Sequence, residues 1–138
     1  TVPEVAVGKR ECTDIGAWIT AQGYQGVECE KCGVNLIEGV AGRVDLVFNR
    51  AIIADIKTTA NPPRSGKPWP EWGYQLSGYY LVLSLPTGPA HSLVVNSITG
   101  ELVPMRWEKE AIDEAQETFK LIMALWRRIK HYDPRGGR

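Results

Sequence analysis

Two neighbouring stretches decide how this sequence folds: Gly42-Arg43-Val44-Asp45-Leu46-Val47-Phe48 and Ile52-Ile53-Ala54-Asp55-Ile56-Lys57. Side chains alternate between the two faces of a strand, so each stretch predicts a strand with one apolar face. Those faces hold Val44, Leu46 and Phe48 in the first strand, and Ile52, Ala54 and Ile56 in the second. Asp45 points away from the apolar face of its strand, and Asp55 and Lys57 point away from theirs. The stretches therefore predict two strands that share a core on one side and carry carboxylates on the other.

The register of this strand pair follows from its apolar faces. A slip of one residue would turn a whole strand over, so the apolar sets face one core only in alternate registers. The tightest such register turns over residues 49–51 and sets Phe48 beside Ile52, Leu46 beside Ala54, and Val44 beside Ile56. It also sets Asp45 directly opposite Asp55, where Cβ atoms lie about 4.5–5.5 Å apart and like charges repel. Two carboxylates placed in this way are either well solvated or hold a cation.

Lys57 adds a cation to the same face, two residues beyond Asp55. Carboxylate oxygens are hard ligands that suit Mg²⁺ or Mn²⁺, and an adjacent ammonium group suits a phosphate. The alternative interpretation is that Asp45, Asp55 and Lys57 form only the solvated polar face of a sheet.

The remaining sequence predicts the elements around this pair. Apolar residues at helical spacing, β-rich runs and turn residues place helices over 9–22, 71–85 and 108–132, and strands over 26–33, 36–48, 51–58, 91–98 and 101–106. Residues 60–70 contain four prolines and predict a loop. The order α-β-β-β-α-β-β-α predicts an α/β (α+β) fold with a central mixed sheet flanked by helices.

Length and composition limit the classes of protein that need consideration. The 138 residues suit one domain, and 16 basic residues balance 16 acidic ones, so bulk charge does not argue for a nucleic-acid partner. No apolar run approaches the roughly 20 residues of a membrane span.

Three cysteines, Cys12, Cys29 and Cys32, favour a reducing, intracellular compartment. The lone Cys-x-x-Cys pair lacks the second pair that a zinc or iron–sulfur site needs, although a cysteine-bound zinc module stays an alternative.

Four motifs in order resemble the PD-(D/E)XK nucleases, and most of all their RecB-type and phage-exonuclease branch. They are Glu28 in the preceding strand, Gly42-Arg43-Val44-Asp45, Asp55-Ile56-Lys57 ten residues later, and Gln75-x-x-x-Tyr79 on the predicted second helix. The resemblance covers roughly residues 27–107. It implies a restriction-endonuclease-like fold.

The resemblance also implies an activity, namely metal-dependent hydrolysis of DNA phosphodiester bonds, as by an exonuclease of recombination, repair or phage DNA processing. Asp45, Asp55, the Ile56 carbonyl and Glu28 would hold Mg²⁺ or Mn²⁺, and Lys57 and Gln75 would complete the catalytic group. The expected compartment is the cytoplasm of a bacterium or phage-infected cell. The rival hypothesis is a nuclease-like domain that binds DNA or a protein partner without cutting, and the oligomeric state is left open.

The sequence departs from the family pattern in its N-terminal part. The family carries a His or Glu on an earlier helix, for which Glu4 and Glu11 are poor candidates, and this leaves open that the helix precedes Thr1. The iron–sulfur subtype needs cysteines after the second helix, and none follows Cys32.

Further contacts to DNA are predicted outside the motifs. Tyr79 could contact nucleic acid or steady the site, and Arg64, Lys67 and Trp69 of the proline-rich loop could meet phosphates or stack on a base. A surface Gln75, a Tyr79 at the core edge and a solvated connecting loop are the alternatives. A basic C-terminal end is a third candidate, although cations also favour a helix C-terminus; it comprises Arg127, Arg128, Lys130, Arg135 and Arg138.

Overall fold

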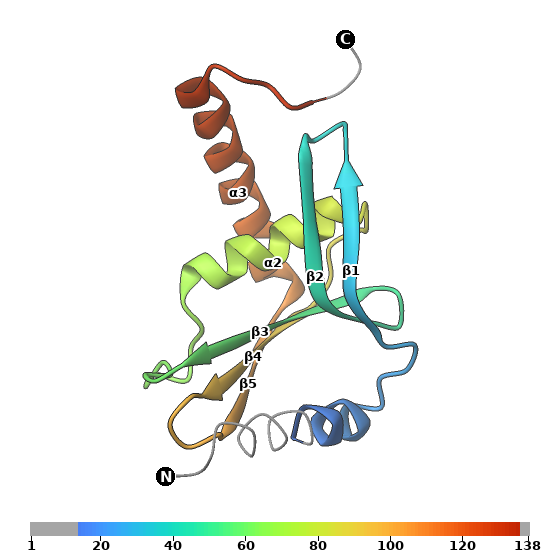
Figure 1. Ribbon diagram of the computed structural model, residues 1–138, viewed down its shortest axis with the longest axis vertical. Coiled ribbons are helices and arrows are strands. Elements are labelled where there is room, and N and C mark those ends of the chain that lie inside the picture. The colour runs from blue at the N-terminus through green and yellow to red at the C-terminus, as the bar shows by residue number, and fades with distance from the viewer. Residues whose placement is uncertain (1–13, 136–138) are drawn as a thin grey trace.

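A five-stranded mixed sheet lies at the centre of the computed structural model, which describes residues 14–135 (Figure 1). Residues 14–22 are helical. The elements that follow are β1 (Glu28–Asn35), β2 (Val40–Phe48), β3 (Ile52–Thr59), α2 (Pro70–Val82), β4 (Ala90–Asn96), β5 (Leu102–Trp107) and α3 (Lys109–Lys130). This order and the mixed sheet confirm the predicted fold class.

The strands lie in chain order across the sheet, and only β3 and β4 are parallel. A parallel pair needs a crossover connection, which here consists of the proline-rich loop and α2. Figure 1 shows α2 crossing one face of the sheet. The crossover therefore carries the Gln75–Tyr79 segment across the side on which β3 presents Asp55.

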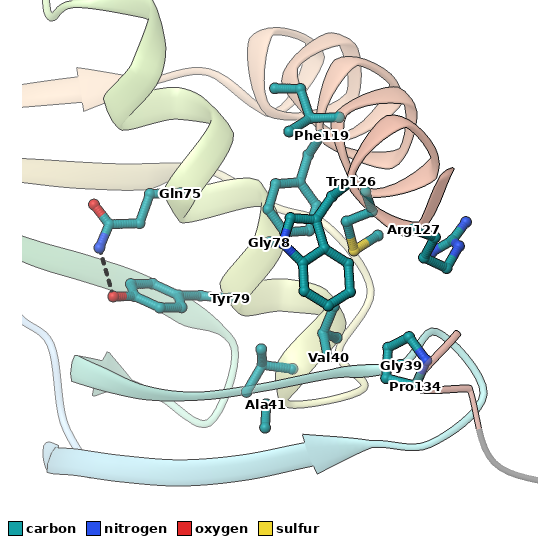
Figure 2. Close-up of a pocket in the computed structure, with 13 residues that line it drawn as sticks. Gly39, Val40, Ala41, Gln75, Gly78, Tyr79, Phe119, Trp126, Arg127 and Pro134 are labelled. Atoms are coloured by element: carbon teal, nitrogen blue, oxygen red, sulfur yellow. Dashed lines mark hydrogen bonds between the residues drawn. The ribbon is translucent and has the colours of Figure 1, made fainter. Parts of the chain in front are cut away.

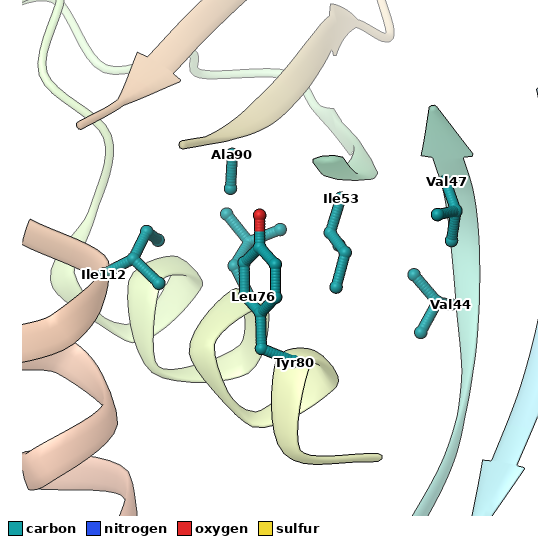
Figure 3. Packing of buried hydrophobic residues seen from close by; sticks show 7 residues of the cluster. All are labelled: Val44, Val47, Ile53, Leu76, Tyr80, Ala90 and Ile112. Atoms are coloured by element: carbon teal, nitrogen blue, oxygen red, sulfur yellow. The ribbon is translucent and has the colours of Figure 1, made fainter. Parts of the chain in front are cut away.

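Helices cover both faces of the sheet, which corrects the prediction of one apolar and one polar face. Figure 3 shows the cluster under α2 and α3, formed by Val44, Val47, Ile53, Leu76, Tyr80, Ala90 and Ile112. On the other face, Leu46, Phe48, Ala54 and Leu93 pack against residues 15–24 of the N-terminal segment. A strand buried on both faces reads as a nearly continuous apolar run, which explains why Val47 and Ile53 are apolar as well.

Turn residues shorten two of the predicted elements. The predicted strand over 36–48 begins only at Val40, because residues 36–39 form a turn whose Ile37 and Glu38 N–H groups donate to the Asn35 side chain. The second helix ends at Val82 rather than at residue 85.

The last helix packs against the body of the protein only through its first half. Ile112 and Ala115 are buried, whereas Ile122, Trp126 and Ile129 of the same predicted face are exposed. Gly78 of α2 permits the contact with α3, because a Cβ atom there would lie 2.8 Å from the Phe119 ring. No helix within residues 14–135 has the length and apolar character to cross a membrane.

Candidate active site

Asp45 and Asp55, the two carboxylates predicted to share one face of the strand pair, lie where β2 and β3 separate. The predicted register is correct for Phe48–Ile52 and Leu46–Ala54, but strand pairing stops there. Val44 is not paired with Ile56, and Asp45 does not face Asp55 across a continuous ladder. Instead, Asp45 Oδ2 accepts a hydrogen bond of 2.8 Å from the backbone N–H of Ile56. A side-chain carboxylate thus takes the place of the next backbone partner.

A change in β1 accompanies this separation. Glu30 adopts a left-handed backbone conformation, with φ 50°, between the pairs Cys29–Leu46 and Lys31–Val44. The register therefore places Glu30 opposite Asp45. Beyond this point Val44 joins Val47 in the cluster beneath α2. The prediction that Val44 shares a face with Leu46 and Phe48 is wrong, because the alternation of β2 does not run unbroken through the distortion.

Ile56 also departs from its predicted place. It was expected in the core, yet its side chain is 38% exposed. Its position lies past the last pair between β2 and β3, so no neighbouring strand supports it on that side. What Ile56 contributes is its backbone. In a strand the N–H and C=O of one residue point to the same edge, so its carbonyl faces the gap that Asp45 occupies.

Asp55 is the buried member of the pair, with only 3% of the residue exposed. Its Oδ2 atom forms an ion pair of 2.5 Å with Nζ of Lys57, so the buried carboxylate has a cationic partner. The pKa of Asp55 is raised to about 6, chiefly by burial and next by the neighbouring Asp45 carboxyl, while Lys57 opposes the rise. The site therefore concentrates negative charge that one lysine compensates incompletely.

Gln75 and Tyr79 extend the polar group from β3 to α2. Lys57 Nζ donates to Gln75 Oε1, and Gln75 Nε2 donates to the Tyr79 hydroxyl oxygen at 2.7 Å (Figure 2). The bond from Lys57 requires Gln75 to present its oxygen there, which directs the amide nitrogen to Tyr79. Burial raises the pKa of Tyr79, and the charge of Asp55 adds to the effect, so the phenol stays protonated. The i, i+4 spacing thus places both side chains beside the carboxylates.

The donor set fits a divalent cation. It comprises the carboxylates of Asp45 and Asp55, which lie close enough to affect each other's protonation, and the backbone carbonyl of Ile56. Mg²⁺ is commonly bound through one or two carboxylates, with water and substrate phosphates supplying the other ligands. Within residues 14–135 no three His, Cys, Asp or Glu side chains gather as a metal-binding group. Such an ion would depend on water and substrate for its remaining ligands.

Glu28, the third predicted acidic ligand, is not brought into this group. Its carboxylate forms an ion pair of 2.9 Å with Lys31, and its strand position pairs with Val47 rather than with Asp45. The other early candidates, Glu4 and Glu11, lie outside the described residues, as does Cys12. Cys29 and Cys32 are exposed on β1 and are not bonded to each other.

The predicted DNA contacts of the proline-rich loop lie beyond the end of β3. Arg64 and Lys67 are exposed, and Trp69 is 39% exposed and packs against Trp72 at a ring-centroid distance of 4.7 Å. At the C-terminal end, Arg127, Arg128 and Lys130 occupy the last turn of α3, whereas Arg135 pairs with Asp133. Arg138 lies outside the described residues.

Sequence reasoning missed a groove between α2 and α3. It has a volume of about 460 Å³, and its lining includes Gln75, Tyr79, Phe119, Met123, Trp126 and Arg127 (Figure 2). We name it the α2–α3 groove. The apolar residues of α3 were interpreted as a continuous packing face, so the exposed position of Trp126 beside Arg127 could not be anticipated.

Comparisons with known proteins add little to this geometry. No family model matches the chain, and no curated protein matches it. A solved structure described as the crystal structure of SSO0001 is similar with a TM-score of 0.44 and 15% identity, over 88% of this chain and 61% of that chain. The chain thus spans less than two thirds of that protein's length. The interpretation of the site depends on its own contacts.

Proposed function

We propose that this chain is a divalent-metal-dependent DNA nuclease domain of the PD-(D/E)XK type, similar to the RecB-type and phage-exonuclease branch. The observation that supports it best is the line of contacts from Asp55 through Lys57 and Gln75 to Tyr79, beside which Asp45 accepts the Ile56 N–H. Two carboxylates, an amine and an amide from three separate elements meet there. A merely solvated sheet face would not bury Asp55, which is 3% exposed.

Asp45, Asp55 and the Ile56 carbonyl would hold Mg²⁺ or Mn²⁺. When bound, the ion would polarise the scissile phosphate and lower the pKa of a coordinated water. The ionised form of Asp55 is the one that binds a cation, so acid below its pKa of about 6 opposes binding.

Lys57 is held by two partners, Asp55 and Gln75. This arrangement orients the ammonium group before substrate arrives, so no reorganisation is needed as charge develops. Its role is to orient the attacking water or to stabilise negative charge on the phosphoryl oxygens. Gln75 positions Lys57, and Tyr79 in turn fixes the amide of Gln75.

DNA is the proposed substrate, and recombination, repair or phage DNA processing inside a bacterial cell is the proposed setting. The charged group at the site supports a phosphodiester substrate although the chain is neutral overall. Lys57 supplies a positive charge at the site, where Asp55 and Gln75 hold its ammonium group.

The test is digestion of end-labelled linear single-stranded and double-stranded DNA with Mg²⁺, with Mn²⁺ and with EDTA. We expect cleavage that requires the metal and disappears in Asp55→Asn and Lys57→Ala. The rival hypothesis is a nuclease-like domain that binds DNA without cutting it. DNA binding without cleavage in either metal would support that rival and overturn the nuclease proposal.

A further inference from the structure

The α2–α3 groove begins at the candidate active site. Gln75 and Tyr79 line the groove and also form the last two members of the polar line that starts at Asp55. A ligand in the groove would therefore touch the same side chains that position Lys57. The groove is continuous with the site and not a separate cavity.

The floor and one wall of the groove are apolar and aromatic. Gly78 lets the Phe119 ring approach α2, and Trp126 projects from α3 towards the start of β2, as Figure 2 shows. Trp126 is 44% exposed, and its ring contact is with Tyr132 at 6.2 Å, in an edge geometry. An indole face left open beside a concave surface is available for stacking. The volume of about 460 Å³ lies within the range of small-ligand sites.

The charges around the groove favour an anionic ligand. Arg127 lies at the end next to Trp126, and Lys57 lies beyond Gln75. No Asp or Glu belongs to the described lining. An apolar peptide or a second copy of the chain would use the aromatic wall but would gain nothing from cations at both ends. A nucleotide strand uses both, because its bases stack on aromatic rings and its phosphates pair with cations.

We infer that the α2–α3 groove binds an unpaired nucleotide of single-stranded DNA, whose neighbouring phosphate would meet the metal ion that Asp45 and Asp55 would hold. The base stacks on Trp126, and Arg127 contacts the adjoining phosphate. The inference deepens the proposed function and depends on it for the identity of the ligand.

The first test is the binding of fluorescein-labelled oligothymidylate in EDTA, measured by anisotropy. Stacking of a base on an aromatic side chain accounts for about 1–3 kcal/mol, so Trp126→Ala should weaken binding by roughly ten-fold or more, and Trp126→Phe by much less. Leu125→Ala is the matched control, because Leu125 is 58% exposed on the same helix and outside the groove. Arg127→Gln should weaken binding more than Arg128→Gln, since only Arg127 lines the groove.

The second test removes the base from the ligand rather than the ring from the protein. An abasic phosphodiester strand of the same length should bind wild type and Trp126→Ala equally. The inference would be overturned if Trp126→Ala lost the same affinity for both strands, or if it lost no affinity for either strand. So would an oligomer that Trp126→Ala dissociates without any change in DNA affinity, because the groove would then hold a second copy.

The two proposals fail separately under these tests. Binding in EDTA reports on the groove alone, whereas cleavage with Mg²⁺ reports on the carboxylates. If the wild-type protein binds thymidylate more tightly than the abasic strand but never cleaves DNA, the groove proposal stands and the nuclease proposal is refuted. If Trp126→Ala leaves cleavage at low substrate concentration unchanged, and thymidylate and the abasic strand bind equally well, the groove proposal is refuted and the nuclease proposal stands.

Discussion

Asp45 accepts the backbone N–H of Ile56 at the point where β2 has stopped pairing with β3. The carboxylate both closes the end of the ladder and lies beside the buried carboxyl of Asp55. Strand separation therefore creates the gap in which two carboxylates and a backbone carbonyl converge. The four predictions below follow from this arrangement and from the charges buried around it.

Asp55→Asn should stabilise the metal-free protein at pH 8. The pKa of Asp55 is about 6 when folded against an ordinary value of 3.8, so the native state loses stability as pH rises through this range. At about 1.4 kcal/mol per pH unit the loss is about 3 kcal/mol above pH 6. Urea unfolding in EDTA should show the gain at pH 8 and almost none near pH 4. A variant less stable than wild type at pH 8 would show that the carboxylate is satisfied.

His91→Gln should remove a pH dependence of stability that has the opposite sign to the one caused by Asp55. Burial lowers the pKa of His91 to about 4 from 6.5, with Arg106 contributing, and its Nε2 lies 2.7 Å from the Tyr24 hydroxyl. The unfolded state therefore binds the proton more tightly, and stability is lost as pH falls from 6.5 towards 4, again by about 3 kcal/mol.

These two effects oppose each other over nearly the same pH range. In the wild type the two contributions to the pH dependence of stability should partly offset each other between about pH 4 and 6. Asp55→Asn should show stability that rises with pH, and His91→Gln stability that falls. The measurement is the slope of the unfolding free energy against pH. The absolute stability of His91→Gln is lower at every pH, because the variant loses the ring contact with Trp18. Parallel slopes in all three proteins would contradict both pKa assignments.

Lys57→Ala should abolish metal-dependent cleavage, with a loss of roughly 100-fold or more in single-turnover rate. Lys57→Arg should not restore it, because a planar guanidinium replaces a compact ammonium that Asp55 and Gln75 hold. The lysine also compensates Asp55, so the melting temperature of Lys57→Ala should fall at pH 8 and recover near pH 5, where Asp55 takes up a proton. Cleavage at the wild-type rate would refute the assigned role.

Asp45→Asn and Asp45→Ala should separate the two roles of Asp45. The amide oxygen of Asn can still accept the Ile56 N–H, whereas Ala removes the acceptor and should cost about 1 kcal/mol of stability. Both should lose Mn²⁺ binding in isothermal titration, because both remove the carboxylate charge. Retained Mn²⁺ affinity in Asp45→Asn would remove Asp45 from the metal ligands.

Local patterns in the sequence determined the elements and most of the members of the candidate site. Alternation over 44–48 and 52–56 predicted the register that Leu46–Ala54 and Phe48–Ile52 adopt, since side-chain direction in a strand depends only on parity. The i, i+4 spacing likewise put Gln75 and Tyr79 on one side of α2, where they are hydrogen-bonded to each other.

The tertiary structure alone decided where β2 leaves β3, which side chains reach Asp55, and where a ligand groove opens. The strand separation is accompanied by a left-handed Glu30 in another strand, and the groove lies where Phe119 packs against Gly78 of a different helix. Such contacts join residues far apart in the chain, and the periodicity of a single segment carries no information about them. The burial that raises the pKa of Asp55 arises in the same way, because the crossover between β3 and β4 brings α2 over the face that carries Asp55.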